Sequence, residues 1–361
     1  MNANWTAIAI YLGAFLIAAL VTTAATPLVI RLATHLGVID GIDEERRVHT
    51  VPTPRIGGLA VFFGFSVALF VVLGIALSSP KTLFPSLAHY SASHQLEAMT
   101  DQFEAAHGMV GLLFGGMLIL GVGVWDDVMG MRPRNKFLAQ IVVALASMLY
   151  GFIIPGITNP FDHNPGTNWI DFPLWLGVPL TLVWYVGMMN AINFIDGLDG
   201  LLAGVASISS LFLFVIAVTH GDPVVALVVI SLAGATLGFL RFNFDPAKIF
   251  LGDAGSLFIG YVFATVSILG ASKTAIAMSV VIPLVVLALP VLDTLAVIVR
   301  RAVAGKAITE ADRGHFHHQL IFRFGLNTRQ AVFLIYAVCL LLGAVALAFS
   351  GTFTHVFRHA I

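Results

Sequence analysis

Long apolar runs alternate with short polar segments along nearly the whole chain. A helix needs ~20 residues to cross the hydrocarbon core of a bilayer, and each run is close to that length. The pattern predicts ten membrane-spanning helices, at residues 7–30, 56–78, 108–125, 137–154, 173–190, 201–219, 224–240, 256–272, 275–299 and 330–350. An even number of spans places both ends of the chain on the same side of the membrane.

The basic residues sort the intervening loops into two sets. The first set comprises residues 31–55, 126–136, 191–200, 241–255 and 300–329. It holds 15 of the 18 lysines and arginines, and the other loops hold only Lys81, Lys273 and Arg358. Because short basic loops stay in the cytoplasm, the first set is predicted to be cytoplasmic and both termini periplasmic or extracellular.

Composition agrees with this interpretation. Hydrophobic residues make up 58% of the 361 positions and charged residues only 10%, against about 25% in soluble domains. We therefore expect one polytopic, all-α integral membrane domain over residues 1–361. The net charge of −1 argues against nucleic acid as a partner. The single cysteine, Cys339, excludes an intramolecular disulfide and a cysteine-rich metal site.

The outer loops carry little recognisable chemistry. Residues 79–107 place Glu97, Asp101 and Glu104 at helical spacing, which indicates the solvated face of a short surface helix. Residues 155–172 are rich in Pro, Gly, Asn and Asp, which is typical of turns or a small hairpin.

The most polar boundary between two runs is residues 190–200, Asn-Ala-Ile-Asn-Phe-Ile-Asp-Gly-Leu-Asp-Gly. Its asparagines, Asn190 and Asn193, are three residues apart, as are Asp196 and Asp199, so each pair can share one face of a helical turn. Such oxygen-bearing side chains suit a hydrated divalent cation and a phosphate-bearing substrate. The alternative is a polar cap between two spans.

Two adjacent carboxylates, Asp126 and Asp127, end the third run. They repel each other unless a cation, a proton or a base lies between them. Arg132, Arg134 and Lys136 follow and could bind phosphate. A loop that only sets topology would explain the basic residues but not the acidic pair, because acidic residues contribute little to orientation.

Two further aspartates stand at or inside apolar runs. Asp253, in the Phe-Leu-Gly-Asp-Ala-Gly-Ser segment, either caps the following helix or lies where phosphate or metal can approach the backbone and the helix N-terminus. Asp293 lies within the ninth run, seven residues before Arg300. It is either a functional group or half of a structural ion pair.

The longest cytoplasmic loop holds a histidine cluster. His315, His317 and His318 follow Arg313 closely. No cysteine accompanies them, so a zinc site is disfavoured, and a cationic clamp for phosphate or sugar is favoured. Arg55, within a Pro-Thr-Pro-Arg-Ile-Gly-Gly turn, belongs to a second basic rim that could equally be ordinary topology-setting charge.

Together these motifs resemble the polyprenyl-phosphate N-acetylhexosamine-1-phosphate transferase family. The resemblance runs from Pro52 to Gln330 and keeps five elements in order: the Pro-Thr-Pro-Arg-Ile-Gly-Gly turn, Asp-Asp, residues 190–200, Gly-Asp-Ala-Gly-Ser, and Asp-Arg-Gly-His-Phe-His-His. Phe316 interrupts the histidines, as in the branch that forms undecaprenyl-pyrophosphoryl-GlcNAc. The muramyl-pentapeptide branch has consecutive histidines.

The resemblance implies a multi-pass enzyme of the bacterial inner (cytoplasmic) membrane. It implies transfer of GlcNAc-1-phosphate from UDP-GlcNAc to the membrane lipid undecaprenyl phosphate, with release of UMP, in cell-surface polysaccharide synthesis. The expected cofactor is Mg²⁺ or Mn²⁺, and a homodimer is compatible with it. Alternatives are a phospho-MurNAc-pentapeptide donor, another UDP-N-acetylhexosamine or, remotely, anion transport. Transport is disfavoured because no internal repeat is evident and the carboxylates gather at one surface.

By the same resemblance, each motif residue receives an expected role. The expected catalytic residues are Asp126, Asp127, Asp196, His315, His317 and His318. The expected substrate-binding residues are Lys136 at a phosphate, Asp199 at uracil, Asn190, Arg313 and Arg55. The expected metal ligands are Asp253, Asn193 and Asp127.

Overall fold

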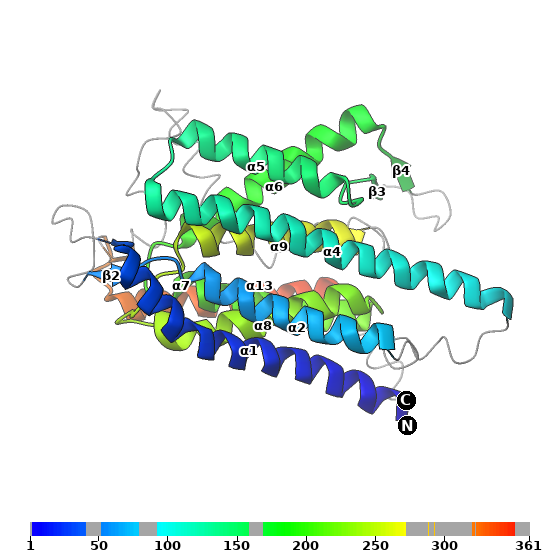
Figure 1. The fold of residues 1–361 in the computed structure, drawn as a ribbon, viewed down its shortest axis with the longest axis horizontal. Coiled ribbons are helices and arrows are strands. Elements are labelled where there is room, and N and C mark those ends of the chain that lie inside the picture. The colour runs from blue at the N-terminus through cyan, green and yellow to red at the C-terminus, as the bar shows by residue number, and fades with distance from the viewer. Residues whose placement is uncertain are drawn as a thin grey trace.

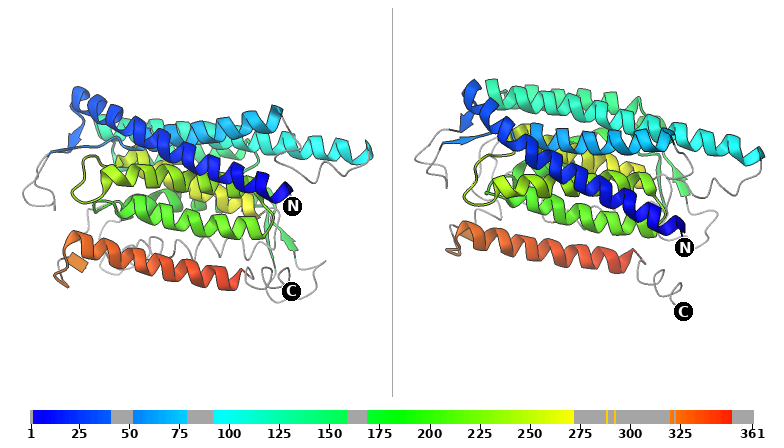
Figure 2. Two further views of the ribbon diagram at one scale, coloured as in Figure 1. Left: turned by 90° about the horizontal axis from the view of Figure 1, so that it is seen from below. Right: turned by 60° about the horizontal axis from the view of Figure 1, so that its bottom comes forward.

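The computed structural model describes residues 2–40, 52–78, 92–158, 169–271, 288, 292, 320–321 and 323–350. These residues form a bundle of long helices that run roughly side by side, with two short hairpins (Figures 1 and 2). The helices are α1 (Asn2–Leu36), α2 (Gly58–Ser78), α4 (Ala92–Met129), α5 (Pro133–Met148), α6 (Leu174–Ile195), α7 (Leu201–Thr219), α8 (Pro223–Asn243), α9 (Gly252–Ala271) and α13 (Thr328–Phe349). The strands are β1 (Ile39–Asp40), β2 (Thr53–Pro54), β3 (Gly156–Thr158) and β4 (Trp169–Asp171).

The predicted all-α membrane architecture is confirmed in its main features. Eight of the described helices are long and apolar enough to cross a membrane. The predicted span at 137–154 corresponds to α5, which has only 16 residues, and the predicted span at 275–299 lies largely outside the described residues. The total of ten spans and the side of the membrane on which the termini lie stay predictions, although α1 starts and α13 ends at the same end of the bundle (Figure 2).

Helix α4 corrects one boundary. A separate surface helix was expected before the third span, but α4 runs without interruption from Ala92 to Met129. The reason is local, because residues 92–107 contain neither glycine nor proline and so nothing ends the helix before the apolar run begins. The expected hairpin at 155–172 is confirmed, since β3 and β4 pair antiparallel with Ile157 opposite Ile170.

Helix α9 lies at the centre of the bundle and α1 at its edge. In the most apolar stretch of each helix, 83% of α9 residues are buried by the rest of the protein, against 17% for α1. The exposed face of α1 carries Leu12, Leu20 and Leu28, which suits contact with lipid tails because these are as apolar as leucine. The first turn of α9 therefore lies among other helices rather than among lipids.

Small residues let neighbouring helices approach the start of α9 closely. A Cβ atom on Gly123 of α4 would lie 2.4 Å from the Ala254 backbone, so only glycine allows this crossing. The turn before α2 joins the same place, because Gly57 and Gly58 donate backbone hydrogen bonds to Phe250 and Leu251, both of 2.9 Å. Two segments distant in sequence, α4 and the turn before α2, thus converge on the N-terminus of α9.

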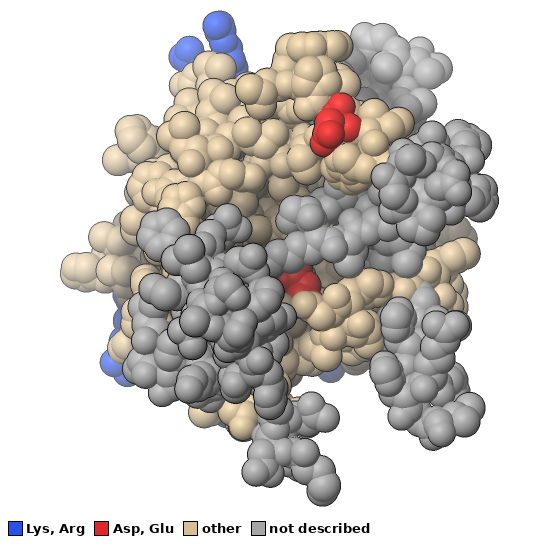
Figure 3. All heavy atoms as spheres, turned by 90° about the vertical axis from the view of Figure 1, so that its right-hand side faces the viewer, with Lys and Arg blue, Asp and Glu red and all other residues tan. Residues whose placement is uncertain are grey.

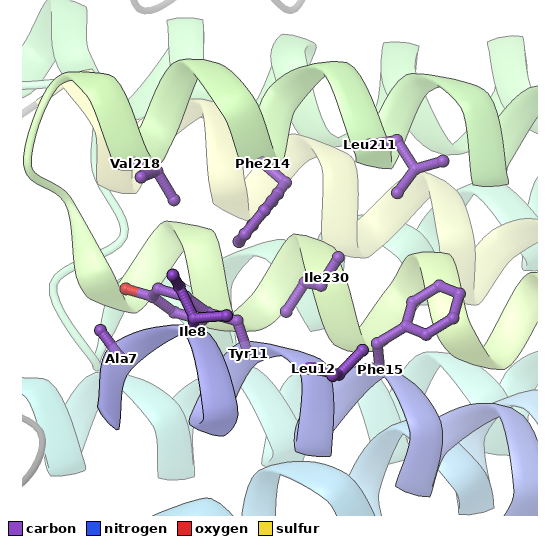
Figure 4. Close-up of a pocket in the computed structure, with 9 residues that line it drawn as sticks. All are labelled: Ala7, Ile8, Tyr11, Leu12, Phe15, Leu211, Phe214, Val218 and Ile230. Atoms are coloured by element: carbon purple, nitrogen blue, oxygen red, sulfur yellow. The ribbon is translucent and has the colours of Figure 1, made fainter. Parts of the chain in front are cut away.

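An apolar groove lies far from this convergence. It has a volume of about 640 Å³ and is lined by α1, α7 and α8 near the start of α1 (Figure 4). Tyr11 and Phe214 pack edge to face across it at 5.2 Å between ring centroids. Its lining offers almost no polar surface, so it is a packing feature of the membrane-embedded part and not the chemical site.

Candidate active site

Asp127 holds the N-terminus of α9. Its two carboxylate oxygens accept backbone hydrogen bonds from Asp253 and Ala254, each of 3.0 Å. Gly252, at φ +69°, brings the backbone so close that a Cβ atom there would lie 2.4 Å from Asp127 Oδ2. A carboxylate is favoured at this position because free amides and the helix dipole both attract negative charge.

This arrangement corrects the expected cap. Asp253 was a candidate to cap its own helix, but it lies in the first turn of α9, and the cap comes from Asp127, 126 residues earlier in the chain. The Asp253 carboxylate is thereby left to other partners.

Arg55 pairs with Asp127 from the other side. Its guanidinium lies 3.2 Å from Asp127 Oδ1 and 3.7 Å from Asp40 Oδ1, with a third of the Arg55 side chain exposed. Burial alone would lower the pKa of Arg55, but the Asp127, Asp40 and Asp253 carboxylates outweigh it and raise that pKa. Arg55 therefore stays cationic at the rim of the site.

Lys136 forms the central ion pair of the cluster. Its Nζ lies 2.9 Å from Asp126 Oδ2 and 2.8 Å from Asp253 Oδ1. Asp126 also accepts the backbone N–H of Met131 at 2.6 Å. The adjacent carboxylates Asp126 and Asp127 thus avoid mutual repulsion by turning to different cations, Lys136 and Arg55.

The asparagines of α6 have different partners from each other. Asn193 donates its amide group to Asp253 Oδ1 at 2.5 Å and to Ser256 Oγ at 2.7 Å. One turn deeper, Asn190 donates to Gln140 Oε1 at 2.6 Å and to the Val186 carbonyl at 2.8 Å. The helix places both asparagines toward α5 and α9, but only Asn193 contacts the charged cluster.

The two aspartates after α6 also diverge. Asp199 is 3% exposed and its Oδ2 accepts the Ala247 N–H at 2.8 Å, so it holds the segment between α8 and α9. Asp196 is half-buried and faces the cluster. Its burial, together with the nearby charges of Asp253, Asp127 and Asp199, raises the pKa of Asp196 to about 8.

The cluster therefore contains more carboxylates than cations. Arg55 and Lys136 face Asp40, Asp126, Asp127, Asp196 and Asp253, all from described residues. Figure 3 shows the opposite end of the bundle, where isolated acidic side chains lie among mostly uncharged ones and the visible basic side chains lie at the rim. An excess of carboxylates at one end favours binding of a further cation there.

The donor set fits Mg²⁺ by chemistry. Within the described residues no group of three His, Cys, Asp or Glu side chains converges as a ready cage. Mg²⁺ commonly uses one or two carboxylates and takes its remaining ligands from substrate phosphates and water. Asp253 could supply such a carboxylate, whereas both oxygens of Asp127 already accept amides and Asn193 turns its nitrogen to Asp253.

Some predicted site residues lie outside the described residues, namely Asp293, Arg313, His315, His317 and His318. Other participants were missed from the sequence. Asp40 reaches Arg55 through the β1–β2 hairpin, and Gln140 bonds Asn190. A signal for Gln140 was its spacing, since it lies one helical turn after Lys136 on α5.

Comparisons with known proteins identify the family of the chain. Residues 109–271 match the model of glycosyl transferase family 4. A probable undecaprenyl-phosphate N-acetylglucosaminyl 1-phosphate transferase of Bacillus subtilis (strain 168) is 34% identical over 330 residues, which cover 90% of this chain and 81% of that protein. The chain belongs to glycosyl transferase family 4.

Two other members of the family show its breadth. A decaprenyl-phosphate N-acetylglucosaminephosphotransferase of Mycobacterium tuberculosis (strain ATCC 25618 / H37Rv) is 35% identical over 340 residues, covering 89% of this chain and 78% of the relative. A phospho-N-acetylmuramoyl-pentapeptide-transferase of Staphylococcus saprophyticus is 29% identical over 344 residues, covering 92% and 97%. The resemblance to polyprenyl-phosphate N-acetylhexosamine-1-phosphate transferases is confirmed.

Proposed function

We propose that the protein transfers GlcNAc-1-phosphate from UDP-GlcNAc to undecaprenyl phosphate and releases UMP. Its family membership makes it a membrane transferase that moves a sugar phosphate to a polyprenyl phosphate. The single observation that carries the proposal at atomic level is the Lys136 ion pair with Asp126 and Asp253. It joins two of the family-like motifs in one charged centre at the end of a membrane helix bundle.

The reaction needs such a centre because two anions must meet. An oxygen of the lipid phosphate attacks the β-phosphorus of the nucleotide sugar. The bond from that phosphorus to the oxygen bridging to the α-phosphorus breaks, and UMP leaves with the electron pair. Phosphoryl transfer of this kind depends mainly on positioning and charge neutralisation. Among the described residues, Lys136 and Arg55 form ion pairs with the carboxylates of this cluster, which supports their role in neutralising phosphate charge.

Lys136 and Arg55 have different positions in this proposal. Lys136 lies on α5 between Asp126 and Asp253, so it is suited to the phosphate groups that exchange. Arg55 lies at the exposed rim and is suited to the phosphates of the incoming nucleotide. Asp196, whose pKa is raised to about 8, can hold or release a proton near neutral pH, which suits a general base.

Asp253 would hold Mg²⁺ in this proposal, with the remaining ligands taken from substrate phosphates and water. A bound Mg²⁺ would supply charge neutralisation for the pyrophosphate. The residues' own part is to present carboxylate oxygens at the start of α9, which Asp127 keeps in place.

The side of the membrane that the site faces is inferred from the basic residues of the loops. The residues of the site lie in or beside loops of the basic set, which holds 15 of the 18 lysines and arginines. By the positive-inside rule the site faces the cytoplasm, where nucleotide sugars are available. We propose the bacterial inner membrane as its location, because the relatives are bacterial.

The rival donor is UDP-MurNAc-pentapeptide, since a relative named for that transfer matches 92% of this chain. The test uses purified protein with undecaprenyl phosphate, Mg²⁺ and a panel of UDP-sugars, with UMP release as the readout. We expect turnover of UDP-GlcNAc and little of the muramyl donor. Preference for the muramyl donor would overturn the donor assignment, and release of no UMP from any donor would overturn the proposed function.

A further inference from the structure

Three polar contacts and two helical turns form a closed ring across three helices. On α5, Lys136 pairs with Asp253 of α9 at 2.8 Å. Asp253 accepts a hydrogen bond from Asn193 of α6. One turn deeper, Asn190 of α6 donates to Gln140 of α5 at 2.6 Å, and Gln140 lies four residues from Lys136. The ring thus starts and ends on α5.

The orientation of the Gln140 amide is determined by its neighbours. The Asn190 nitrogen must face the Val186 carbonyl, which can only accept, and the same nitrogen donates its second hydrogen to Gln140. Gln140 therefore presents its oxygen to Asn190. Its nitrogen is buried and has no hydrogen-bond partner among the described residues.

If packing alone mattered, an apolar side chain at position 140 would be more stabilising than glutamine. Gln140 is 0% exposed. A buried amide whose nitrogen makes no hydrogen bond destabilises the packing of helices rather than improving it. Such violations of the packing rules concentrate at functional sites. Gln140 is too deeply buried to touch a substrate, so a functional role must act through its neighbours.

We propose that Gln140 is a positioning residue, which closes the α5–α6 side of the ring and so holds Lys136 in register with Asp253 and Asn193. Lys136 is ~6 Å from Gln140 along the helix axis, one turn nearer the end of the bundle. A small rotation or shift of α5 would separate Lys136 from Asp253, and displacements of about 1 Å can lower rates 10²-fold. The inference rests on the proposed transferase function.

Ser147 provides a matched control on the same face of α5. It is also buried at 0% exposure and links α5 to α9 through Tyr261 OH at 3.1 Å. It lies seven residues beyond Gln140, away from the charged cluster. If Gln140 only docks α5 in the bundle, Gln140→Met and Ser147→Ala should act alike.

The experiment compares both variants in UMP release from UDP-GlcNAc and in thermal unfolding of the purified full-length protein. We expect Gln140→Met to lower kcat roughly 10–100-fold with KM for UDP-GlcNAc within about threefold, and Ser147→Ala to keep kcat within about twofold. Both should unfold at similar temperatures. Equal specific activities of the two variants, or a kcat loss matched by loss of folded protein, would overturn the positioning role.

A double-mutant cycle tests whether the effect passes through Lys136. The Lys136→Arg background keeps the charge but changes the contact. In this background Gln140→Met should lower kcat about threefold or less, whereas Ser147→Ala should have the same small effect on kcat in both backgrounds. Full additivity of Gln140→Met and Lys136→Arg would contradict the inference. Inactivity of the wild-type protein with every donor would instead reject the proposed function on which it rests.

Discussion

The same three helices, α5, α6 and α9, are joined by two polar clusters of opposite character. At the end of the bundle, Lys136, Asn193 and Asp253 connect them through charged contacts. Deeper in the bundle, neutral hydroxyls connect them: Ser147 on α5 bonds Tyr261 on α9 at 3.1 Å, and Tyr185 on α6 bonds Thr265 on α9 at 2.9 Å. The Tyr185 and Tyr261 rings stack at 5.5 Å between centroids.

The two clusters differ in how well donors match acceptors and negative charges match positive ones. In the hydroxyl cluster donors and acceptors match, and no charge is present, so it can only stabilise the packing. Among the described residues of the charged cluster, carboxylates outnumber cations, and Asp196 has a pKa of about 8. An unbalanced cluster costs free energy in the absence of a ligand, which is expected of a site that binds cations and phosphates. The comparison predicts separable effects on activity and on stability.

The largest expected effect is at Asp253. Asp253→Asn removes the negative charge that pairs with Lys136 and that is proposed to bind Mg²⁺. The Asp127 cap on α9 stays in place. We expect kcat to fall on the order of 10³-fold with normal membrane insertion and thermal stability. UMP release and thermal unfolding of the same preparation measure both. A variant within tenfold of the wild-type rate would show that the charged cluster is not the chemical centre.

EDTA treatment gives a second measurement at the same site. Removal of divalent cations should abolish UMP release, and Mg²⁺ or Mn²⁺ should restore it. Full activity in EDTA would contradict the metal role of Asp253 without affecting the ion pair with Lys136.

Part of this division could be predicted from the sequence. The apolar runs predicted the spans because hydrophobic length directly reflects bilayer thickness. The motifs predicted the charged residues because ionisable side chains such as Asp126, Asp253 and Lys136 cost free energy near a membrane and therefore indicate a functional site. Sequence spacing also placed Asn190 and Asn193 on one helix face, as α6 shows.

The pairing of these residues could not be predicted. Asp127 caps α9 from 126 residues away, and nothing in local spacing specifies which helix N-terminus a distant carboxylate reaches. Asn190 and Asn193 share a face, yet they bind Gln140 and Asp253 respectively, because tertiary packing sets the register of α5 and α9 against α6. Helix faces follow from periodicity, whereas contacts between helices depend on side-chain packing.

The next effect separates the adjacent aspartates. Asp127→Asn turns an amide NH₂ toward the N–H groups of α9 and leaves an amide there without an acceptor, at about 1–3 kcal/mol. Asp126→Asn weakens one contact of Lys136 but leaves α9 capped. We therefore expect Asp127→Asn to lower both the Tm and the activity, and Asp126→Asn to lower the activity at an unchanged Tm. Equal Tm values for the two variants would contradict the capping role.

The pH dependence of stability is a smaller effect and tests Asp196. Its pKa is about 8 in the folded protein and about 3.9 when unfolded, so the folded state binds the extra proton between these values. Stability from this group is then lost progressively as the pH rises from about 4 to about 8. In EDTA, the Tm should fall between pH 6 and pH 8.5 for the wild type. Asp196→Asn should flatten that fall, and an unchanged slope in the variant would contradict the raised pKa.

The smallest effect belongs to the hydroxyl cluster. Tyr261→Phe removes the bond to Ser147 but keeps the ring in place, and Ser147 still donates to the Val143 carbonyl at 2.9 Å. Because no buried group is orphaned, the loss should be about 0.6 kcal/mol, the typical value for such bonds between membrane helices. The Tm should fall by a few degrees at most, and UMP release per folded molecule should stay within about twofold of wild type. A large loss of activity at an unchanged Tm would mean that the two clusters are coupled through α9, and the separation between a structural and a chemical cluster would be wrong.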